Sequence, residues 1–153
     1  MVTIENLKGF KIFKHLNERE LEQVVNIAEE TVFDAGIRIF EEKALAVNLY
    51  LVLEGKVELK ISSGDSLKQV IIDQAGPGEI FGWSAVTEPH TFTAAAWTVE
   101  KSKLIVLSSA HLNDLFEKNN HIGYRIIKEI ATVATKRVKA LESRLVEAMH
   151  TKG

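Results

Sequence analysis

Residues 76–82 read GPGEIFG, and a run with three glycines and one proline in seven positions predicts a sharp corner in the chain. Pro77 and Gly78 form a turn, because proline restricts its own φ and glycine adopts conformations that other residues avoid. Gly82 lets the backbone approach a ligand closely, just before residues 83–86, WSAV, which favour a short helix. The free N–H groups at a helix start suit a phosphate. Two interpretations stay open: the corner binds a ligand, or its glycines only turn the chain.

The corner lies within residues 31–107, where Ile, Val, Tyr, Phe and Trp alternate with polar residues and glycines separate short runs. Strands are predicted at residues 31–34, 37–41, 48–54, 56–62, 67–74, 79–82, 93–99 and 102–107. Within residues 50–61, apolar positions alternate with Glu58 and Lys60, which predicts a hairpin with one solvated face. Because helices do not alternate with these strands, the pattern favours an antiparallel barrel, roll or sandwich over a parallel sheet.

Helical periodicity frames this region on both sides. One apolar stripe within residues 1–30 consists of Leu21, Val24, Val25 and Ala28. Asn17 is the predicted N-cap, because Glu20 follows three residues later, as in a capping box. After Ser108, a short helical segment at residues 109–118 precedes a long one at residues 120–149. We therefore expect helices before and after the strands.

The long segment carries an apolar seam whose spacing alternates between four and three residues, as in a coiled coil. The seam consists of Ile127, Ala131, Ala134, Val138, Leu141 and Leu145. A helix of 30 residues is about 45 Å long, which is more than a domain of this size covers. We therefore expect a homodimer in which this C-terminal helix pairs with its copy; the alternative is that the seam folds back onto the sheets. Residues 119–123, NNHIG, favour a hinge before the helix, unless an asparagine there only caps a static helix.

Length and composition are those of one ordinary domain. The chain has 153 residues, of which 46% are hydrophobic and 26% charged, with a net charge of −2. This charge argues against direct nucleic acid binding, which depends on attraction to phosphates. The absence of cysteine excludes a disulfide scaffold and a cysteine nucleophile. Because no apolar run of 18 residues and no signal sequence occur, we expect a cytoplasmic location and no membrane contact.

Three short motifs stand in order along the chain. They are Gly36, Ile39 and Phe40 in "G-x-x-I-F", Tyr50, Val52, Gly55 and Val57 in "Y-x-V-x-x-G-x-V", and residues 76–82 in "x-P-G-x-x-F-G". Together they resemble the cyclic nucleotide-binding domain family, to which catabolite activator protein and the regulatory subunits of protein kinase A belong. The resemblance implies a regulatory or sensor function.

The resemblance also implies a fold for the whole chain. It implies one domain over residues 1–153, of the α+β class and mainly β. At residues 31–108 it implies an eight-stranded antiparallel, jelly-roll-like β-roll, also described as a double-stranded β-helix. N-terminal helices at residues 1–30 and C-terminal helices at residues 109–150 flank this roll.

The family's phosphate-binding cassette reads approximately F-G-E-[LI]-A-[LV], followed by a loop and R-[ST]-A. The resemblance implies that its glutamate binds the ribose 2′-hydroxyl and its arginine binds the cyclic phosphate. Here Trp83 stands at the glutamate position, and Thr93, or Phe92 in a shifted alignment, stands at the arginine position. Because residues 76–97 contain no Lys or Arg, we do not expect cAMP to bind in the usual way.

The candidate pocket consists of Gly82, Trp83, Ser84, Ala85, Thr93 and Ala94. Two interpretations of its tryptophans stay open. Trp83 and Trp97, with Ser84 and Thr93, hold an apolar or weakly polar ligand, or the two indoles fill the pocket. A nucleotide-like or other small ligand therefore stays open, and no cofactor is predicted.

Catalytic and metal-binding motifs do not occur. The sequence has no G-x-S-x-G, no GK[ST] after its glycine run and no H-x-H pair, so we expect neither an enzyme nor a metal site. For the single histidines we expect surface or capping roles; they are His15, His90, His111, His121 and His150.

Transcription factors that resemble this chain carry a DNA-binding winged helix-turn-helix after the long helix. We expect none here, because the sequence stops four residues after Met149. The basic residues of the long helix are interpreted as a solvated charged face; they are Lys136, Arg137, Lys139 and Arg144. The resulting hypothesis is a regulatory domain that passes a signal through its long helix to an unknown effector protein. The alternative is a ligand-free dimerisation or protein-docking module of the same fold.

Overall fold

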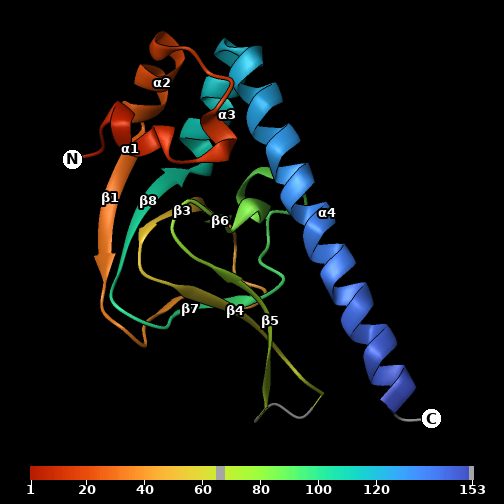
Figure 1. Ribbon diagram of the computed structural model, residues 1–153. Coiled ribbons are helices and arrows are strands. Elements are labelled where there is room, and N and C mark those ends of the chain that lie inside the picture. The colour runs from red at the N-terminus through yellow and green to blue at the C-terminus, as the bar shows by residue number, and fades with distance from the viewer. Residues whose placement is uncertain (65–67, 152–153) are drawn as a thin grey trace.

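Eight antiparallel strands in two four-stranded sheets form the roll in the computed structural model, which describes residues 1–64 and 68–151 (Figure 1). The first sheet has the order β1 (Ala28–Phe33), β8 (Ser102–Ser108), β3 (Asn48–Glu54) and β6 (Ile80–Phe81). The second has the order β2 (Arg38–Phe40), β7 (Ala95–Thr98), β4 (Val57–Ser62) and β5 (Gln69–Ala75). The predicted α+β fold with an eight-stranded antiparallel roll is therefore confirmed. Leu67, the first residue of one predicted strand, lies outside the described residues.

An apolar core fills the space between the two sheets. On β4, Val57 and Leu59 are buried in this core, whereas Glu58 alternates with them and faces outward, as predicted. Aromatic side chains extend the core toward the corner at residues 76–82, where the Tyr50 and Phe81 rings stack with centroids 5.0 Å apart. Because Phe81 is fully buried, the residues that follow it are held against the core.

The predicted hairpin over residues 50–61 is wrong. β3 pairs with β6 and β8 in the first sheet, whereas β4 pairs with β5 and β7 in the second. Between β3 and β4, Gly55 has a φ of +100°, and a Cβ at this position would lie 2.2 Å from the Ser102 Oγ. This close approach carries the chain from one sheet into the other, so that the hairpin partner of β4 is β5.

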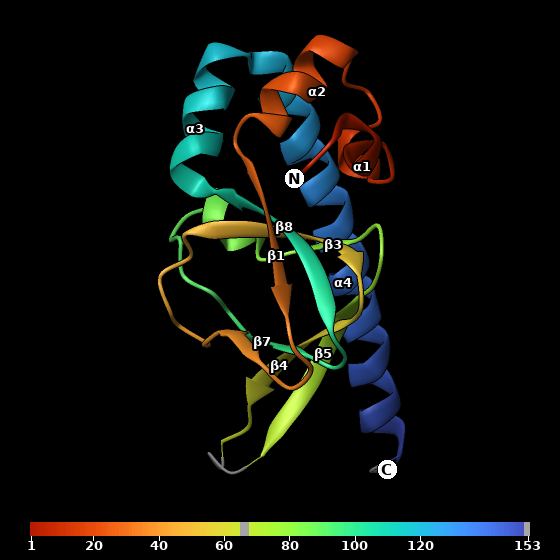
Figure 2. The same ribbon diagram turned by 90° about the vertical axis from the view of Figure 1, so that its left-hand side faces the viewer.

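Three short helices close one end of the roll (Figure 2). They are α1 (Ile4–Lys8), the 3₁₀ helix η1 (Lys11–Phe13) and α2 (Glu18–Val25). The predicted capping box is confirmed, because Asn17 Oδ1 accepts from the Glu20 N–H at 2.9 Å and Glu20 Oε1 accepts from the Asn17 N–H at 3.2 Å. The prediction that Ala28 is helical is wrong. Ala28 begins β1, and pairing of the whole strand with β8 outweighs the local helical spacing.

Two helices end the chain, and the longer one runs diagonally past the roll (Figures 1 and 2). They are α3 (Ser109–Lys118) and α4 (Asn120–Thr151), which confirms both predicted segments. Ile122, Ile126 and Ile130 form a buried stripe of α4 in a second apolar core, which includes the N-terminal helices and α3. The same spacing continues to Val133, which packs against this core. No helix within the described ranges is long and apolar enough to cross a membrane.

Candidate functional site

The corner at residues 76–82 leads into η2 (Trp83–Val86), a 3₁₀ helix of four residues, which confirms the predicted short helix. Gly82 precedes it with a φ of +80°, in the left-handed region that glycine adopts without a steric penalty. A Cβ on Gly82 would lie 3.0 Å from Tyr50 Cδ2 and 3.3 Å from the Asn48 carbonyl oxygen. Backbone conformation and close packing therefore both require glycine at the start of η2.

The loop at residues 87–94 returns the chain from η2 to the second sheet. Its end is fixed by backbone hydrogen bonds to the segment after β2. The Phe92 N–H donates to the Ala44 carbonyl oxygen at 2.9 Å, and the Lys43 N–H donates to the Phe92 carbonyl oxygen at 2.8 Å. These bonds place the next residue, Thr93, opposite η2.

A cavity of about 30 Å³ lies between η2, this loop and α4. It is lined by Phe40, Leu59, Gly82, Trp83, Ser84, Phe92, Thr93, Ala94 and Arg137. The Phe40 and Phe92 rings stack with centroids 3.5 Å apart and make one wall apolar. The volume is close to that of one water molecule, whereas small-ligand sites typically measure about 300–1,000 Å³. A nucleotide does not fit in this conformation.

Arg137 lines the cavity from the side of α4. Its guanidinium carbon lies 4.2 Å from the centroid of the Trp83 ring, and its Nε donates to Asp73 Oδ2 at 2.9 Å. The Arg137 side chain is 14% exposed, so this contact is largely shielded from water. We call the Arg137–Trp83 contact the latch, because it joins α4 to the first residue of η2. A cation over a tryptophan face contributes about 0.5–2 kcal/mol, with the larger values in desolvated contacts.

The structure brings together five of the six predicted pocket residues. Those that line the cavity are Gly82, Trp83, Ser84, Thr93 and Ala94. Ala85, within η2, does not line the cavity and is fully buried. The interpretation of Arg137 as part of a solvated face is wrong. Its spacing of four residues from Val133, on the buried stripe of α4, is the sequence signal that could have identified it.

Trp97 does not reach the cavity, so its prediction as a pocket residue is wrong. It lies on the outer face of the second sheet, where the Arg38 guanidinium carbon and the Lys60 Nζ are 5.6 and 5.8 Å from its ring centroid. Side chains alternate along β7, and Ala96 takes the inward position. The Trp97 Nε1 is buried and has no hydrogen-bond partner in the described part of the chain.

Comparisons with known proteins agree with this fold. The family model of the cyclic nucleotide-binding domain matches residues 30–119, which span the roll and α3. The chain belongs to the cyclic nucleotide-binding domain family. Trp83, predicted at the glutamate position of the pattern given above, lines the cavity, and so do Thr93 and Phe92, the two alternatives for its arginine position. The assignment of these positions stays a prediction.

Relatives of this domain occur in proteins of several kinds. A candidate cyclic nucleotide-binding protein of Geobacter metallireducens has a similar structure, with a TM-score of 0.80 and 30% identity, covering 90% of this chain and 99% of that one. A candidate potassium channel protein of Rhodopseudomonas palustris is 26% identical over 75% of this chain and 27% of its own length. The regulatory subunit of a cAMP-independent protein kinase A from Trypanosoma brucei shares the fold, with a TM-score of 0.77 and 17% identity, covering 93% of this chain and 50% of that one. The chain spans 11–46% of the length of the curated relatives it matches.

The cyclic nucleotide-binding cassette of this chain has an unusual charge distribution. Among the described residues that line the cavity, Arg137 is the one that carries a charge, and it comes from α4 rather than from the cassette. Thr93 offers a hydroxyl and Trp83 offers one ring N–H, and neither carries a charge. An anion in this cavity would therefore depend on a side chain that already contacts Trp83 and Asp73.

The outer side of α4 carries most of the predicted dimer seam. Ile127, Val138 and Leu145 are 39%, 54% and 62% exposed. Ala131 is also exposed, whereas Ala134 and Leu141 are half-buried. Several apolar side chains of the seam are therefore exposed along α4, and dimerisation through them stays a prediction.

The junction between α3 and α4 is held by α2. Asn119 Oδ1 accepts from the backbone N–H groups of His121 and Ile122 at 3.1 and 3.2 Å, which confirms the predicted asparagine cap. Asn119 Nδ2 donates to Glu20 Oε2 at 3.1 Å, and His121 Nδ1 lies 2.8 Å from the same oxygen. Burial raises the pKa of the Glu20 carboxyl, but its hydrogen bonds with His121, the Asn17 backbone and Asn119 together hold that pKa below its ordinary value. The hinge role of this junction stays a prediction.

His121 thus pairs with a buried carboxylate rather than with solvent alone. His90, in the cassette loop, has its Nδ1 3.3 Å from the Ala85 carbonyl oxygen. Within residues 1–64 and 68–151, no group of three or more His, Cys, Asp or Glu side chains is arranged to hold a metal ion.

Proposed function

We propose that the chain is a non-enzymatic regulatory domain of the cyclic nucleotide-binding family whose cassette does not bind cAMP in the usual way. One observation carries this proposal: the cassette cavity measures about 30 Å³, and Trp83 and Arg137 of α4, which contact each other, line it. Regulation then consists of opening and closing this contact between the cassette and the long helix.

Residues 76–97 contain no arginine to bind a cyclic phosphate. A hydrogen bond to a charged group contributes about 1.5–3 kcal/mol, so the loss of a bidentate arginine–phosphate pair costs about 3–6 kcal/mol. This corresponds to about two to four decades in Kd. A phosphate next to the Phe40 and Phe92 rings would also lose hydration, and the neutral donors Thr93 and Trp83 would compensate for only part of that loss. Tight cAMP binding is not expected.

Arg137 could take the place of the missing arginine only by giving up its present contacts, which costs free energy. To face a phosphate inside the cavity, its guanidinium would have to leave both the Trp83 ring and the Asp73 carboxylate. The Trypanosoma brucei kinase regulatory subunit described as cAMP-independent has the same fold, which supports a role for this fold without cAMP.

We propose that the domain passes its signal on as a homodimer in the cytoplasm. The occupant of the exposed α4 face is a second copy of α4, because the seam repeats the four-three spacing of paired helices. Ile127, Val138 and Leu145 would be buried in such a pair. Opening the latch would free the roll-facing side of α4 and alter the geometry of the pair. An effector protein would respond to that change.

A second candidate function is a ligand-free dimerisation or docking module. The small volume of the cassette cavity favours it, because a site filled by its own side chains needs no ligand. A thermal-shift screen separates the two functions, since a ligand at 100 times its Kd adds about 2.7 kcal/mol of stability. No shift with any ligand supports the docking module.

Calorimetric titration with cAMP and cGMP tests the main proposal. For the wild-type chain we expect no binding tighter than about 100 μM, and for Trp83→Glu with Thr93→Arg we expect a measurable gain in affinity. Trp97→Phe is the matched control, because Trp97 lies outside the cavity. A submicromolar Kd for the wild-type chain would refute the proposal.

A further inference from the structure

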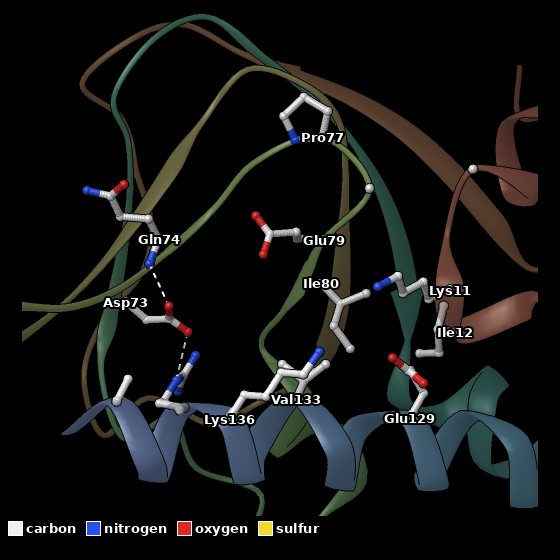
Figure 3. A pocket seen from close by; sticks show the side chains of 14 residues that line it. Lys11, Ile12, Asp73, Gln74, Pro77, Glu79, Ile80, Glu129, Val133 and Lys136 are labelled. Atoms are coloured by element: carbon white, nitrogen blue, oxygen red, sulfur yellow. Dashed lines mark hydrogen bonds and ion pairs between the residues drawn. The ribbon is translucent and has the colours of Figure 1, made fainter. Parts of the chain in front are cut away.

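A second and larger cavity lies outside the cassette, between η1, the turn before β6 and α4 (Figure 3). Its volume is about 550 Å³, which falls within the range of small-molecule sites. It is lined by η1, the end of β5, the turn that follows it, and α4. Lys11 and Ile12 come from η1, Pro77 and Glu79 come from the turn, and Glu129, Val133, Lys136 and Ala140 come from α4.

The walls of this cavity select the class of ligand. Ile12, Ile80 and Val133 form an apolar surface inside it. None of its described lining residues is aromatic, so a nucleobase would find no ring to stack on. The site therefore suits a small aliphatic group rather than a nucleotide.

Charges of both signs face this apolar surface. Among the described residues, no carboxylate lies within 4.0 Å of the Lys11 or Lys136 ammonium group. In the same part of the chain, no cationic group lies within 4.0 Å of the Glu129 carboxylate either. Figure 3 shows Lys11 and Glu129 at one end of the cavity, with Glu79 across from α4. Glu79 accepts one hydrogen bond, from the Gly76 N–H at 2.9 Å.

The lining thus carries charges of both signs, on the exposed Lys11, Lys136 and Glu79 and on the half-buried Glu129, rather than an excess of one sign. A molecule with one group of each sign complements such a lining. We propose that this cavity binds a small zwitterion of the α-amino-acid class, with its carboxylate toward Lys136 and its ammonium toward Glu129. Its aliphatic side chain lies against Ile80.

This ligand would also act on the latch. It touches η1, the turn and α4 at once, and the Arg137–Asp73 pair forms part of the same cavity wall. Occupancy holds α4 against the roll and stabilises the closed cassette, because a ligand shifts an equilibrium toward the state it binds more tightly. The proposal does not depend on whether the cassette binds cAMP.

The test is a titration of the ¹⁵N-labelled full chain with the standard L-α-amino acids, followed by backbone amide shifts. We expect at least one aliphatic amino acid to bind with a Kd below about 5 mM and to shift Gly78 and Val133. The corresponding amine and the corresponding carboxylic acid, which each lack one charge, should bind about 10-fold more weakly.

Variants locate the site. Lys136→Met and Glu129→Gln should each weaken the amino acid by about 10-fold, whereas Lys139→Met, an exposed lysine on α4 outside this cavity, should leave its Kd within about twofold. The proposal is overturned if no amino acid binds, if the singly charged analogues bind equally well, or if Lys136→Met binds like Lys139→Met. Amide shifts confined to residues 82–94 would assign the binding to the cassette instead.

Discussion

Replacing Arg137 by methionine removes the guanidinium but keeps an unbranched stem, so it tests the latch with little change in packing. The contact over Trp83 is largely shielded from water, which places it at about 1–2 kcal/mol. The pair with Asp73 adds about 0.2–1 kcal/mol, because Asp73 is 36% exposed and keeps part of its hydration when the arginine is removed. The expected loss in the free energy of unfolding is about 2 kcal/mol, or about 4–8 °C in Tm for a chain of this length.

Urea denaturation followed by circular dichroism measures this loss, with Lys139→Met as the control for removing a charge from α4. A double-mutant cycle with Trp83→Leu isolates the latch itself, and its coupling energy should be about 1 kcal/mol. If Arg137→Met is no less stable than Lys139→Met, or if the cycle gives no coupling, the contact does not fasten α4 to the cassette.

Three further predictions concern the dimer, the junction and the cassette glycine. Val138→Glu should convert the dimer into a folded monomer, because Val138 is exposed in the single chain. Analytical ultracentrifugation at about 50 μM measures this, and the control Ser143→Glu should remain dimeric. A monomeric wild-type chain would contradict the proposed interface. Because the pKa of the Glu20 carboxyl is lowered on folding, its stabilisation is present above its unfolded pKa and is lost as the pH falls through the folded value. The stability difference between wild type and Glu20→Gln in urea should therefore shrink between pH 7 and pH 3, and a constant difference would contradict this. Gly82→Ala should destabilise the chain by about 1–2 kcal/mol in thermal unfolding, whereas Gly64→Ala, with open space around it, should change stability by less than about 0.5 kcal/mol.

Local patterns in the sequence predict the elements well, because each depends on nearby residues. Alternation of polar and apolar residues in β4, the capping box at Asn17 and Glu20, and the helix start at Gly82 are all confirmed. Local patterns do not predict which strands pair, since strand pairing depends on contacts between segments that are distant in the sequence. The predicted hairpin of β3 and β4 failed because Gly55 packs against Ser102, 47 positions later, and sends the strand into the other sheet.

The sequence locates the cassette from its glycines, but it does not identify Arg137 as the charged residue that lines the cassette cavity. Trp83 and Thr93 line one cavity, as the resemblance implies, because they belong to the same corner of the roll. Arg137 is separated from Trp83 by more than fifty residues, and a charged residue on a long helix is ordinarily solvated. Only the path of α4 across the roll brings the guanidinium to the indole. The prediction for Trp97 was wrong because side chains alternate along β7, which places the Trp97 side chain on the outer face of the second sheet.

If Arg137 and Trp83 close the cassette, cAMP leaves the environment of the Trp83 indole unchanged. Titration of cAMP into the ¹⁵N-labelled chain measures this, with the Trp83 indole resonance assigned by its persistence in Trp97→Phe. We expect this resonance to stay in place up to about 10 μM cAMP, well below the expected limit on Kd. A Trp83 resonance that shifts and saturates at submicromolar cAMP would show an open cassette and contradict this expectation.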